Sequence, residues 1–190
     1  MKILFIADLH DFEQSNINKI ITLNFDYCML LGDINKVHVL YISNIIKKPC
    51  FGIVGNHDVF STLNGTNVEN IAFKTINLDG YNILGIDGGV RYKRGMYAMY
   101  TQEELLEKCN NLPKADILIS HETGYHYLKD DLVHEGFKAI DEYILKNKPK
   151  YNIFGHYHQQ YDFMKNNTRC ICVYQCIILD VDTGNIEYIF

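Results

Sequence analysis

Short apolar runs alternate with amphipathic segments along the first third of the chain. The runs have almost no polar residue, which is typical of strands buried on both faces of a sheet. They lie at Ile3–Ala7, Tyr27–Leu31 and Phe51–Val54. The segments between them are predicted helices, at Asn16–Leu23 and Val37–Ile46. This alternation predicts βαβ units and a largely parallel sheet.

The pattern changes in the middle of the chain. Phe73–Leu78 and Tyr81–Ile86 flank Asp79-Gly80, which is a strong signal for a β-hairpin. Thr101 and Glu104 have the spacing of a capping box, so a helix is expected from there to about Asn110. The remaining elements are a strand at Ile117–Ser120, a helix at Phe137–Lys146, a strand at Tyr151–Phe154, and antiparallel strands from Tyr161 onward with turns at Asn166-Asn167 and 182–185.

Composition narrows the class of protein. The 190 residues are 47% hydrophobic and 22% charged, as in an ordinary globular domain, and residues 1–190 are expected to form a single domain without a cap domain. The net charge of −5, with no Lys/Arg block, predicts no general affinity for nucleic acid. The apolar start is too short for a signal peptide and no run could span a membrane, so a cytoplasmic location is expected. Six cysteines without a C-x-x-C pair are expected to be buried, reduced thiols.

Polar clusters of Asp, Asn and His follow almost every apolar run. They are Asp8-Leu9-His10, Gly32-Asp33, Gly55-Asn56-His57-Asp58, Ser120-His121 and Gly155-His156-Tyr157-His158. Open α/β sheets bind their ligands at the carboxyl ends of their strands. Hard oxygen ligands and imidazoles gathered there are what a two-metal hydrolytic site requires.

The residue types suit different tasks at such a site. Asp8 and His10 would project to the same face of an extended chain, and their mixture of ligands suits Mn, Fe or Zn. The two oxygens of Asp33 can bridge two cations, and the Asn56 carbonyl can bind a metal without adding charge. The adjacent His57 can protonate a leaving alkoxide, with Asp58 available to orient its ring.

This ordered set of motifs resembles the calcineurin-like metallophosphoesterases, of the small single-domain bacterial or phage type, over about the first 160 residues. The resemblance implies an α/β fold, a four-layer αββα sandwich of two mixed sheets. It implies one metal on Asp8, His10, Asp33 and His158, and a second on Asp33, Asn56, His121 and His156. Asp33 would bridge the two ions, and His57 would contact the phosphate as the general acid, with Asp58 behind it.

The activity so implied is hydrolysis of a small phosphodiester or phosphomonoester by metal-bound hydroxide. Two divalent ions are expected, Mn²⁺ first, with Fe, Zn, Ni and Mg as alternatives. Their charge outweighs that of Asp8, Asp33 and a hydroxide, so the site would attract phosphate although the protein is acidic. Nucleotides and cyclic nucleotides are candidate substrates, and diesters are favoured by analogy alone. Asn56, His57 and Arg91 are the predicted substrate contacts.

Some features leave alternatives open. Glu122-Thr123-Gly124 follows His121 where relatives often carry two prolines, and Asp11 stands where many have Gly. Arg91, in the loop that follows Gly88, is expected to bind a substrate phosphate or to be a solvated loop residue. His126 and His134 are expected to be loop residues rather than substrate contacts. The alternative function is a non-catalytic metal-binding scaffold that binds a protein partner; the presence of His57 and of every ligand favours the enzyme.

Overall fold

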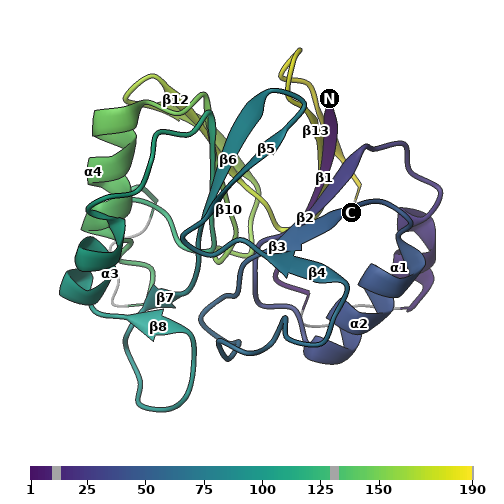
Figure 1. Ribbon diagram of the computed structural model, residues 1–190, viewed down its shortest axis with the longest axis horizontal. Helices are drawn as coiled ribbons and strands as arrows, with labels where there is room; N and C mark the ends of the chain where they lie inside the picture. Colours follow the sequence, from purple (N-terminus) through teal and green to yellow (C-terminus); the bar gives the residue numbers. More distant parts are fainter. Residues whose placement is uncertain (10–13, 129–132, 190) are drawn as a thin grey trace.

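Strand β1 (Lys2–Ala7) illustrates how the apolar pattern builds the layers of the protein. The computed structural model describes residues 1–9, 14–128 and 133–189 (Figure 1). In this structure, alternate side chains of β1 enter two different cores. Ile3, Phe5 and Ala7 join the core between the two sheets, whereas Leu4 and Ile6 join the core beneath the first pair of helices. The expected burial of this strand on both faces is confirmed.

The first sheet has six strands in the order β14-β13-β1-β2-β3-β4. Strands β1 to β4 run parallel, and β13 and β14 add an antiparallel edge. The bounds not yet given are β2 Tyr27–Leu30, β3 Cys50–Gly52, β4 Val68–Asn70, β13 Gln175–Asp180 and β14 Ile186–Tyr188. Helices α1 (Gln14–Ile20) and α2 (Lys36–Ile45) cover its outer face (Figure 1).

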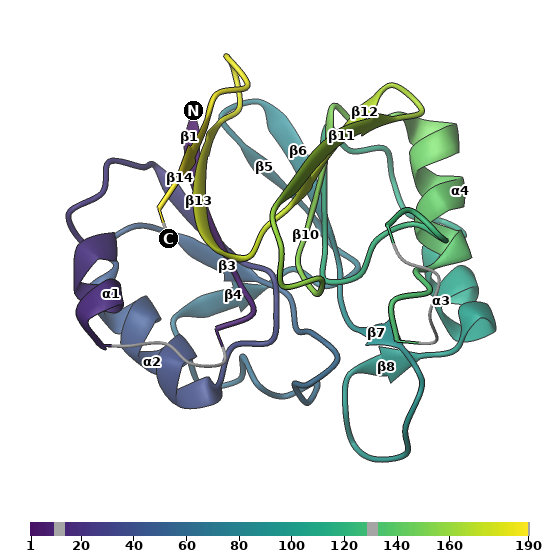
Figure 2. The ribbon, with the colours of Figure 1, turned by 180° about the vertical axis from the view of Figure 1, so that it is seen from behind.

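The second sheet has the order β11-β12-β10-β9-β6-β5, with parallel pairing at its centre and antiparallel hairpins at both edges. Its strands are β5 Thr75–Leu78, β6 Tyr81–Ile86, β9 Ile117–Ser120, β10 Tyr151–Phe154, β11 Tyr161–Lys165 and β12 Thr168–Cys172. Helices α3 (Gln102–Cys109) and α4 (Lys138–Asn147) cover its outer face, as Figure 2 shows from behind. A two-stranded ribbon, β7 (Gly89–Val90) and β8 (Met99–Tyr100), lies below α3.

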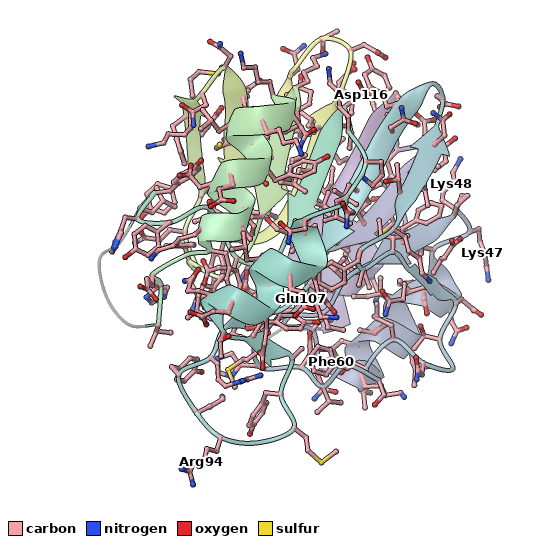
Figure 3. The ribbon with its side chains drawn as sticks, turned by 60° about the vertical axis from the view of Figure 1, so that its left-hand side comes forward. Lys47, Lys48, Phe60, Arg94, Glu107 and Asp116 are labelled. Carbon is pink, nitrogen blue, oxygen red and sulfur yellow. The ribbon has the colours of Figure 1, made fainter. Side chains whose placement is uncertain are left out.

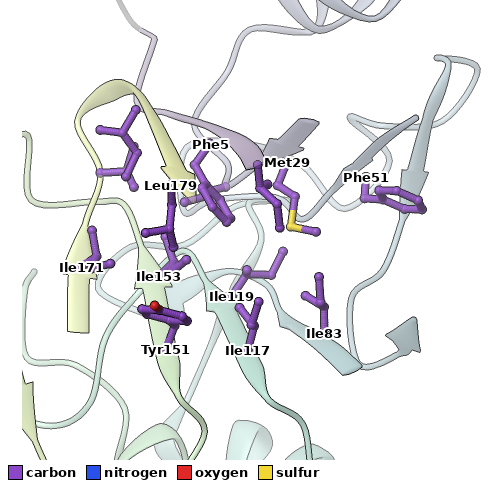
Figure 4. Packing of buried hydrophobic residues seen from close by; sticks show 14 of the residues in the cluster. Phe5, Met29, Phe51, Ile83, Ile117, Ile119, Tyr151, Ile153, Ile171 and Leu179 are labelled. Carbon is purple, nitrogen blue, oxygen red and sulfur yellow. The ribbon is translucent and has the colours of Figure 1, made fainter. Parts of the chain in front are cut away.

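The inner faces of the two sheets pack directly against each other. Phe5, Met29 and Phe51 of the first sheet face Ile83, Ile119 and other side chains of the second (Figure 4). Burial of this apolar surface is the main force holding the layers together. The four-layer αββα sandwich of two mixed sheets is therefore confirmed.

Most predicted elements are present within a few residues of their expected bounds. The Thr101–Glu104 capping box is confirmed in both directions, and all six cysteines are buried and free. Strands β4, β7 and β8 were not predicted. Among the described residues, no helix is long and apolar enough to cross a membrane, and the cytoplasmic location stays a prediction.

Candidate metal centre

The predicted ligands come together where strands of the two sheets end. Asp8 follows β1 and Asp33 follows β2, both in the first sheet, while His121 and His156 follow β9 and β10 of the second. Hydrogen bonds join the two groups across the gap between sheets: the His156 backbone N–H donates to Asp8 Oδ2 at 2.8 Å, and His121 Nδ1 lies 2.8 Å from the Leu31 carbonyl. His10 and Asp11 lie outside the described residues.

The backbone at these ligands is unusual. Four of them adopt positive φ angles: Asp8 at 56°, Asp33 at 53°, His156 at 73° and His158 at 51°. Asp and His enter the left-handed region more readily than most residues, although it still costs free energy. Such conformations persist only where the surroundings enforce them, and they cluster at functional sites.

Two side-chain oxygens lie near one ring nitrogen of His121. Its Nε2 lies 2.9 Å from Asn56 Oδ1 and 3.4 Å from Asp33 Oδ2. Because Nδ1 donates to the Leu31 carbonyl, the neutral ring would present a lone pair at Nε2 to these two oxygens. Such an arrangement requires either a proton or a metal cation between them.

The pKa of His121 indicates that Nε2 of its ring holds a proton in the metal-free protein. Burial lowers the pKa of His121, but the charge and hydrogen bond of Asp33, the charge of Asp8 and the Leu31 carbonyl together raise it to about 10. Burial likewise works to raise the pKa of Asp33, but His121 holds it well below its usual range. His156 differs: burial, followed by the charge of His121, lowers its pKa to about 4.

Three of the predicted ligands form one group in the structure. Asp33, His121 and His156 have ligand atoms within 4.8 Å of one another, the spacing expected around one ion. On the other side, His158 Nε2 lies 3.5 Å from Asp8 Oδ1. Oδ1 of Asp8 and Oδ2 of Asp33 are buried with no hydrogen-bond partner among the described residues. Buried, orphaned carboxylate oxygens beside imidazole nitrogens fit a pair of divalent cations.

The turns around the ligands have no room for larger residues. A Cβ on Gly55 would lie 2.2 Å from Asp33 Oδ1, and one on Gly155 would lie 2.7 Å from Asp8 Oδ2. The glycines before the Asn-His-Asp and His-Tyr-His motifs therefore allow the backbone to pass directly against the carboxylates.

His57 and Asp58 adjoin these ligands. The backbone N–H of His57 donates to Asp33 Oδ1 at 2.8 Å, and its side chain is exposed. Oδ2 of Asp58 accepts hydrogen bonds from the backbone N–H groups of Asp33 (2.8 Å) and Gly55 (2.9 Å). Asp58 thus connects, through these two hydrogen bonds, the turn that contains Asp33 and the turn that contains Asn56. The orientation of the His57 ring by Asp58 stays a prediction.

One cavity borders this region, and the lining of a second includes Val59, which follows Asp58 in the sequence. The first, of about 440 Å³, is lined by His57, Val133, His134, His156, Tyr157, His158 and Gln159. His134, expected to be a loop residue, lies in this wall with its ring centroid 4.9 Å from that of His156. No local motif predicts this contact, because His134 and His156 are far apart in the sequence.

The second cavity, of about 970 Å³, contains Arg91. The guanidinium is bound to the Glu104 carboxylate at 2.7 Å and 3.0 Å and to the Met99 carbonyl at 3.0 Å. The rings of Phe60 and Tyr100 contact each other in the same wall, with centroids 5.4 Å apart and planes tilted by 54°. Figure 3 shows Phe60 below α3 and Arg94 at the tip of the neighbouring loop, directed outward. Substrate binding by Arg91 stays a prediction.

The fold and its motifs are similar to those of known proteins. The family model described as calcineurin-like phosphoesterase matches residues 1–160. No match was found among curated proteins. TT1561 of Thermus thermophilus is 15% identical over 98% of this chain and 96% of its own, with a TM-score of 0.69. A novel archaeal phosphodiesterase also shares the fold: it is 15% identical over 98% of this chain and 98% of its own, with a TM-score of 0.53. Zn²⁺-bound Vps29 from Entamoeba histolytica is 11% identical over 98% of this chain and 89% of its own, with a TM-score of 0.54.

Proposed function

The chain belongs to the calcineurin-like phosphoesterase family, and we propose that it is a binuclear metal-dependent phosphoesterase. One metal would be held by Asp8, His10, Asp33 and His158, and the other by Asp33, Asn56, His121 and His156. Mn²⁺ is the proposed metal in both positions, with Fe, Zn, Ni and Mg as alternatives.

The observation that carries this proposal is the pair of orphaned carboxylate oxygens. Asp8 Oδ1 and Asp33 Oδ2 are buried, and each lies 3.4–3.5 Å from an imidazole Nε2. A fold that leaves one oxygen of each buried carboxylate without a hydrogen-bond donor bears a cost that bound cations would offset. Because Asp33 Oδ1 already accepts the His57 N–H, Oδ2 is the oxygen available for metal binding.

The protein would use these residues to position and protonate the substrate. Bound divalent ions activate water and neutralise charge on the phosphate. His57 is exposed in the wall of the 440 Å³ cavity, next in sequence to Asn56, where its ring can reach a leaving-group oxygen. It would donate a proton to that oxygen, with Asp58 stabilising the ring.

The organic part of the substrate would extend toward the 970 Å³ cavity. Val59 and Phe60 directly continue the His57-Asp58 segment into its wall, and Asp58 O accepts a hydrogen bond from Ala98 N at 2.8 Å. Aromatic side chains and the nearby cations, Arg91 included, suit a nucleotide or another anionic ester with a planar group. A phosphodiester is preferred because one solved structure of this fold is a phosphodiesterase.

The alternative is a non-catalytic metal-binding scaffold for a protein partner. One observation favours it: Phe60 and Met96, which both line the 970 Å³ cavity, are 47% and 85% exposed. Exposed apolar groups of this kind occur at protein interfaces. A metal-loaded protein that hydrolyses no ester would support the scaffold.

The direct test compares Mn²⁺-loaded wild type with His57→Ala and Asp33→Asn, using bis-p-nitrophenyl phosphate and p-nitrophenyl phosphate. We expect loss of hydrolysis in both variants and loss of metal in Asp33→Asn alone. Wild type that is inactive with every divalent metal, or variants that match it, would contradict the proposal. A screen of nucleotides, cyclic nucleotides and phosphosugars, repeated with Phe60→Ala, then tests the substrate.

A further inference from the structure

Glu122 is a buried carboxyl group beside the candidate metal centre that the proposed reaction does not use. It directly follows His121 at the end of β9, and its side chain is fully buried. Oε1 accepts a hydrogen bond from the Thr123 N–H at 3.0 Å, whereas Oε2 has no hydrogen-bond partner among the described residues. Burying a carboxyl group so incompletely paired costs free energy, so its position calls for a functional reason.

Glu122 is directed at a metal ligand. Its Oε2 lies 3.2 Å from His156 Nε2, and the Val133 carbonyl lies 2.9 Å from the same nitrogen. Two acceptors therefore face Nε2, which must carry the proton of the neutral ring. The low pKa of His156 agrees with a neutral ring. Nδ1 is then the nitrogen with a free lone pair, and it is the atom that His156 can offer to a cation.

We propose that Glu122 is a positioning residue for His156: its carboxylate lies against the Nε2–H that the Val133 carbonyl accepts, and this keeps Nδ1 toward the cation shared with Asp33 and His121. The inference rests on the metal site of the proposed function. Histidine ligands commonly donate their second N–H to a carboxylate, which fixes the tautomer and makes the ligating nitrogen more basic. The two residues come from neighbouring strands, β9 and β10, so the contact is built into the sheet.

The Val133 carbonyl alone could fix the tautomer, and this sets the design of the test. A carbonyl accepts the hydrogen bond but carries no full charge, whereas the ionised carboxylate adds negative charge next to the ligand. Burial raises the pKa of Glu122 to about 7 in the metal-free protein, and a bound cation would favour the ionised form. Glu122→Gln keeps the shape of the side chain and removes the charge, and Glu122→Ala removes both. Glu107→Gln is the matched control, because it makes the same chemical change on the exposed face of α3 (Figure 3).

The experiment measures Mn²⁺ binding by calorimetry, the Co²⁺ absorption spectrum, and thermal unfolding of the metal-free proteins. We expect Glu122→Gln to bind the ion held by His156 about tenfold less tightly, to change the Co²⁺ bands, and to unfold at or above the wild-type temperature. Glu107→Gln should match wild type throughout. Loss of affinity without loss of stability is the signature that separates positioning from a packing role.

Two results would overturn the inference while the proposed function stands. One is wild-type Mn²⁺ affinity and an unchanged Co²⁺ spectrum in Glu122→Gln. The other is weaker binding explained by a lower unfolding temperature of metal-free Glu122→Gln, which would make Glu122 a structural residue. If wild type itself binds no divalent ion, both the proposed function and the inference fail. This outcome differs from the two above, in which wild type binds metal and only the inference fails.

Discussion

The side-chain oxygen of Asn56 lies 2.9 Å from Nε2 of His121, whose other ring nitrogen is engaged by the Leu31 carbonyl. The Asn56 amide nitrogen is directed the other way, 3.5 Å from the Tyr92 hydroxyl, which places the oxygen on the His121 side. An acceptor therefore faces the one atom of His121 that can bind a metal. A proton or a cation must lie between them, and the two compete for the same position.

This competition predicts that metal affinity falls as the pH is lowered. In the metal-free protein, burial lowers the pKa of His121, but Asp33, Asp8 and the Leu31 carbonyl together raise it to about 10. His121 is thus protonated at neutral pH, and a metal must displace that proton. His156, with a pKa of about 4, has none to release. We expect the apparent Kd for Mn²⁺ to rise about tenfold for each pH unit lowered and each proton displaced.

Calorimetry checks this prediction directly. Titrations at one pH in buffers with different enthalpies of ionisation count the protons released, and at least one is expected between pH 6.5 and 8. A Kd that is independent of pH, with no proton released, would mean that His121 is neutral before the metal binds.

A second prediction concerns Asp58 as a structural tie. Asp58→Ala removes the acceptor of two N–H groups, those of Asp33 and Gly55. Leaving these donors unpaired should lower the free energy of unfolding by about 1–3 kcal/mol and weaken Mn²⁺ binding. Asp58→Asn retains an acceptor oxygen and should keep both properties.

Urea unfolding of the metal-free proteins and Mn²⁺ titrations give these two quantities. Turnover by Asp58→Asn then isolates the second role: a lower kcat with intact stability and metal binding would support the predicted pairing with His57. An Asp58→Ala protein as stable as wild type would show that the tie contributes nothing.

The parts of the fold and site that local patterns encode were predicted from the sequence. Strand β9 was placed correctly because its apolar run is short and uninterrupted, and α3 because its capping box is a local motif. Asp8 and Asp33 follow such runs, so their position at the sheet edge follows from the order of strands. Strands β7 and β8 have two residues each, which leaves no periodicity to recognise.

What the sequence could not predict depends on contacts between distant segments. Glu122 was noted only as a departure from relatives, because its approach to His156 is set by the pairing of β9 with β10. His134 lies in a loop, as expected, but the packing of its ring near His156 joins residues far apart in the sequence and could not be predicted. The hydrogen bond from the Asp33 N–H to the Asp58 carboxylate likewise joins segments that are distant in the sequence.

A third prediction tests the close approach of backbone and ligand. Gly55→Ala would place a methyl group 2.2 Å from Asp33 Oδ1 and 2.7 Å from His121 Cε1. Asp33 must shift, so we expect Mn²⁺ affinity to fall by tenfold or more while circular dichroism still reports a folded protein. Gly80→Ala is the control: its methyl group would meet open space, at a positive φ of 90°. It should cost about 1–2 kcal/mol of stability and leave the Mn²⁺ Kd unchanged. Equal loss of metal in both variants would point to general destabilisation.

A fourth prediction concerns Asp87, which is 4% exposed and accepts a hydrogen bond from the Tyr100 hydroxyl at 3.0 Å. Burial raises the pKa of Asp87 to about 6, despite the opposing effects of Tyr100 and Lys108. The folded protein therefore holds this proton more tightly than the unfolded chain. The contribution of Asp87 to stability is greatest below pH 4 and is lost as the pH rises through 6.

Asp87→Asn keeps the shape of the side chain but cannot ionise, so it should lack this pH dependence. Relative to wild type, its free energy of unfolding is expected to increase by about 3 kcal/mol between pH 4 and pH 7, because two pKa units correspond to roughly that amount. Urea unfolding of metal-free protein at several pH values measures the difference. Tyr100→Phe removes the hydroxyl that favours the carboxylate, so its stability should fall more steeply with pH than that of wild type. A difference between Asp87→Asn and wild type that stays constant across this range would mean that Asp87 ionises in the folded protein as readily as in the unfolded chain.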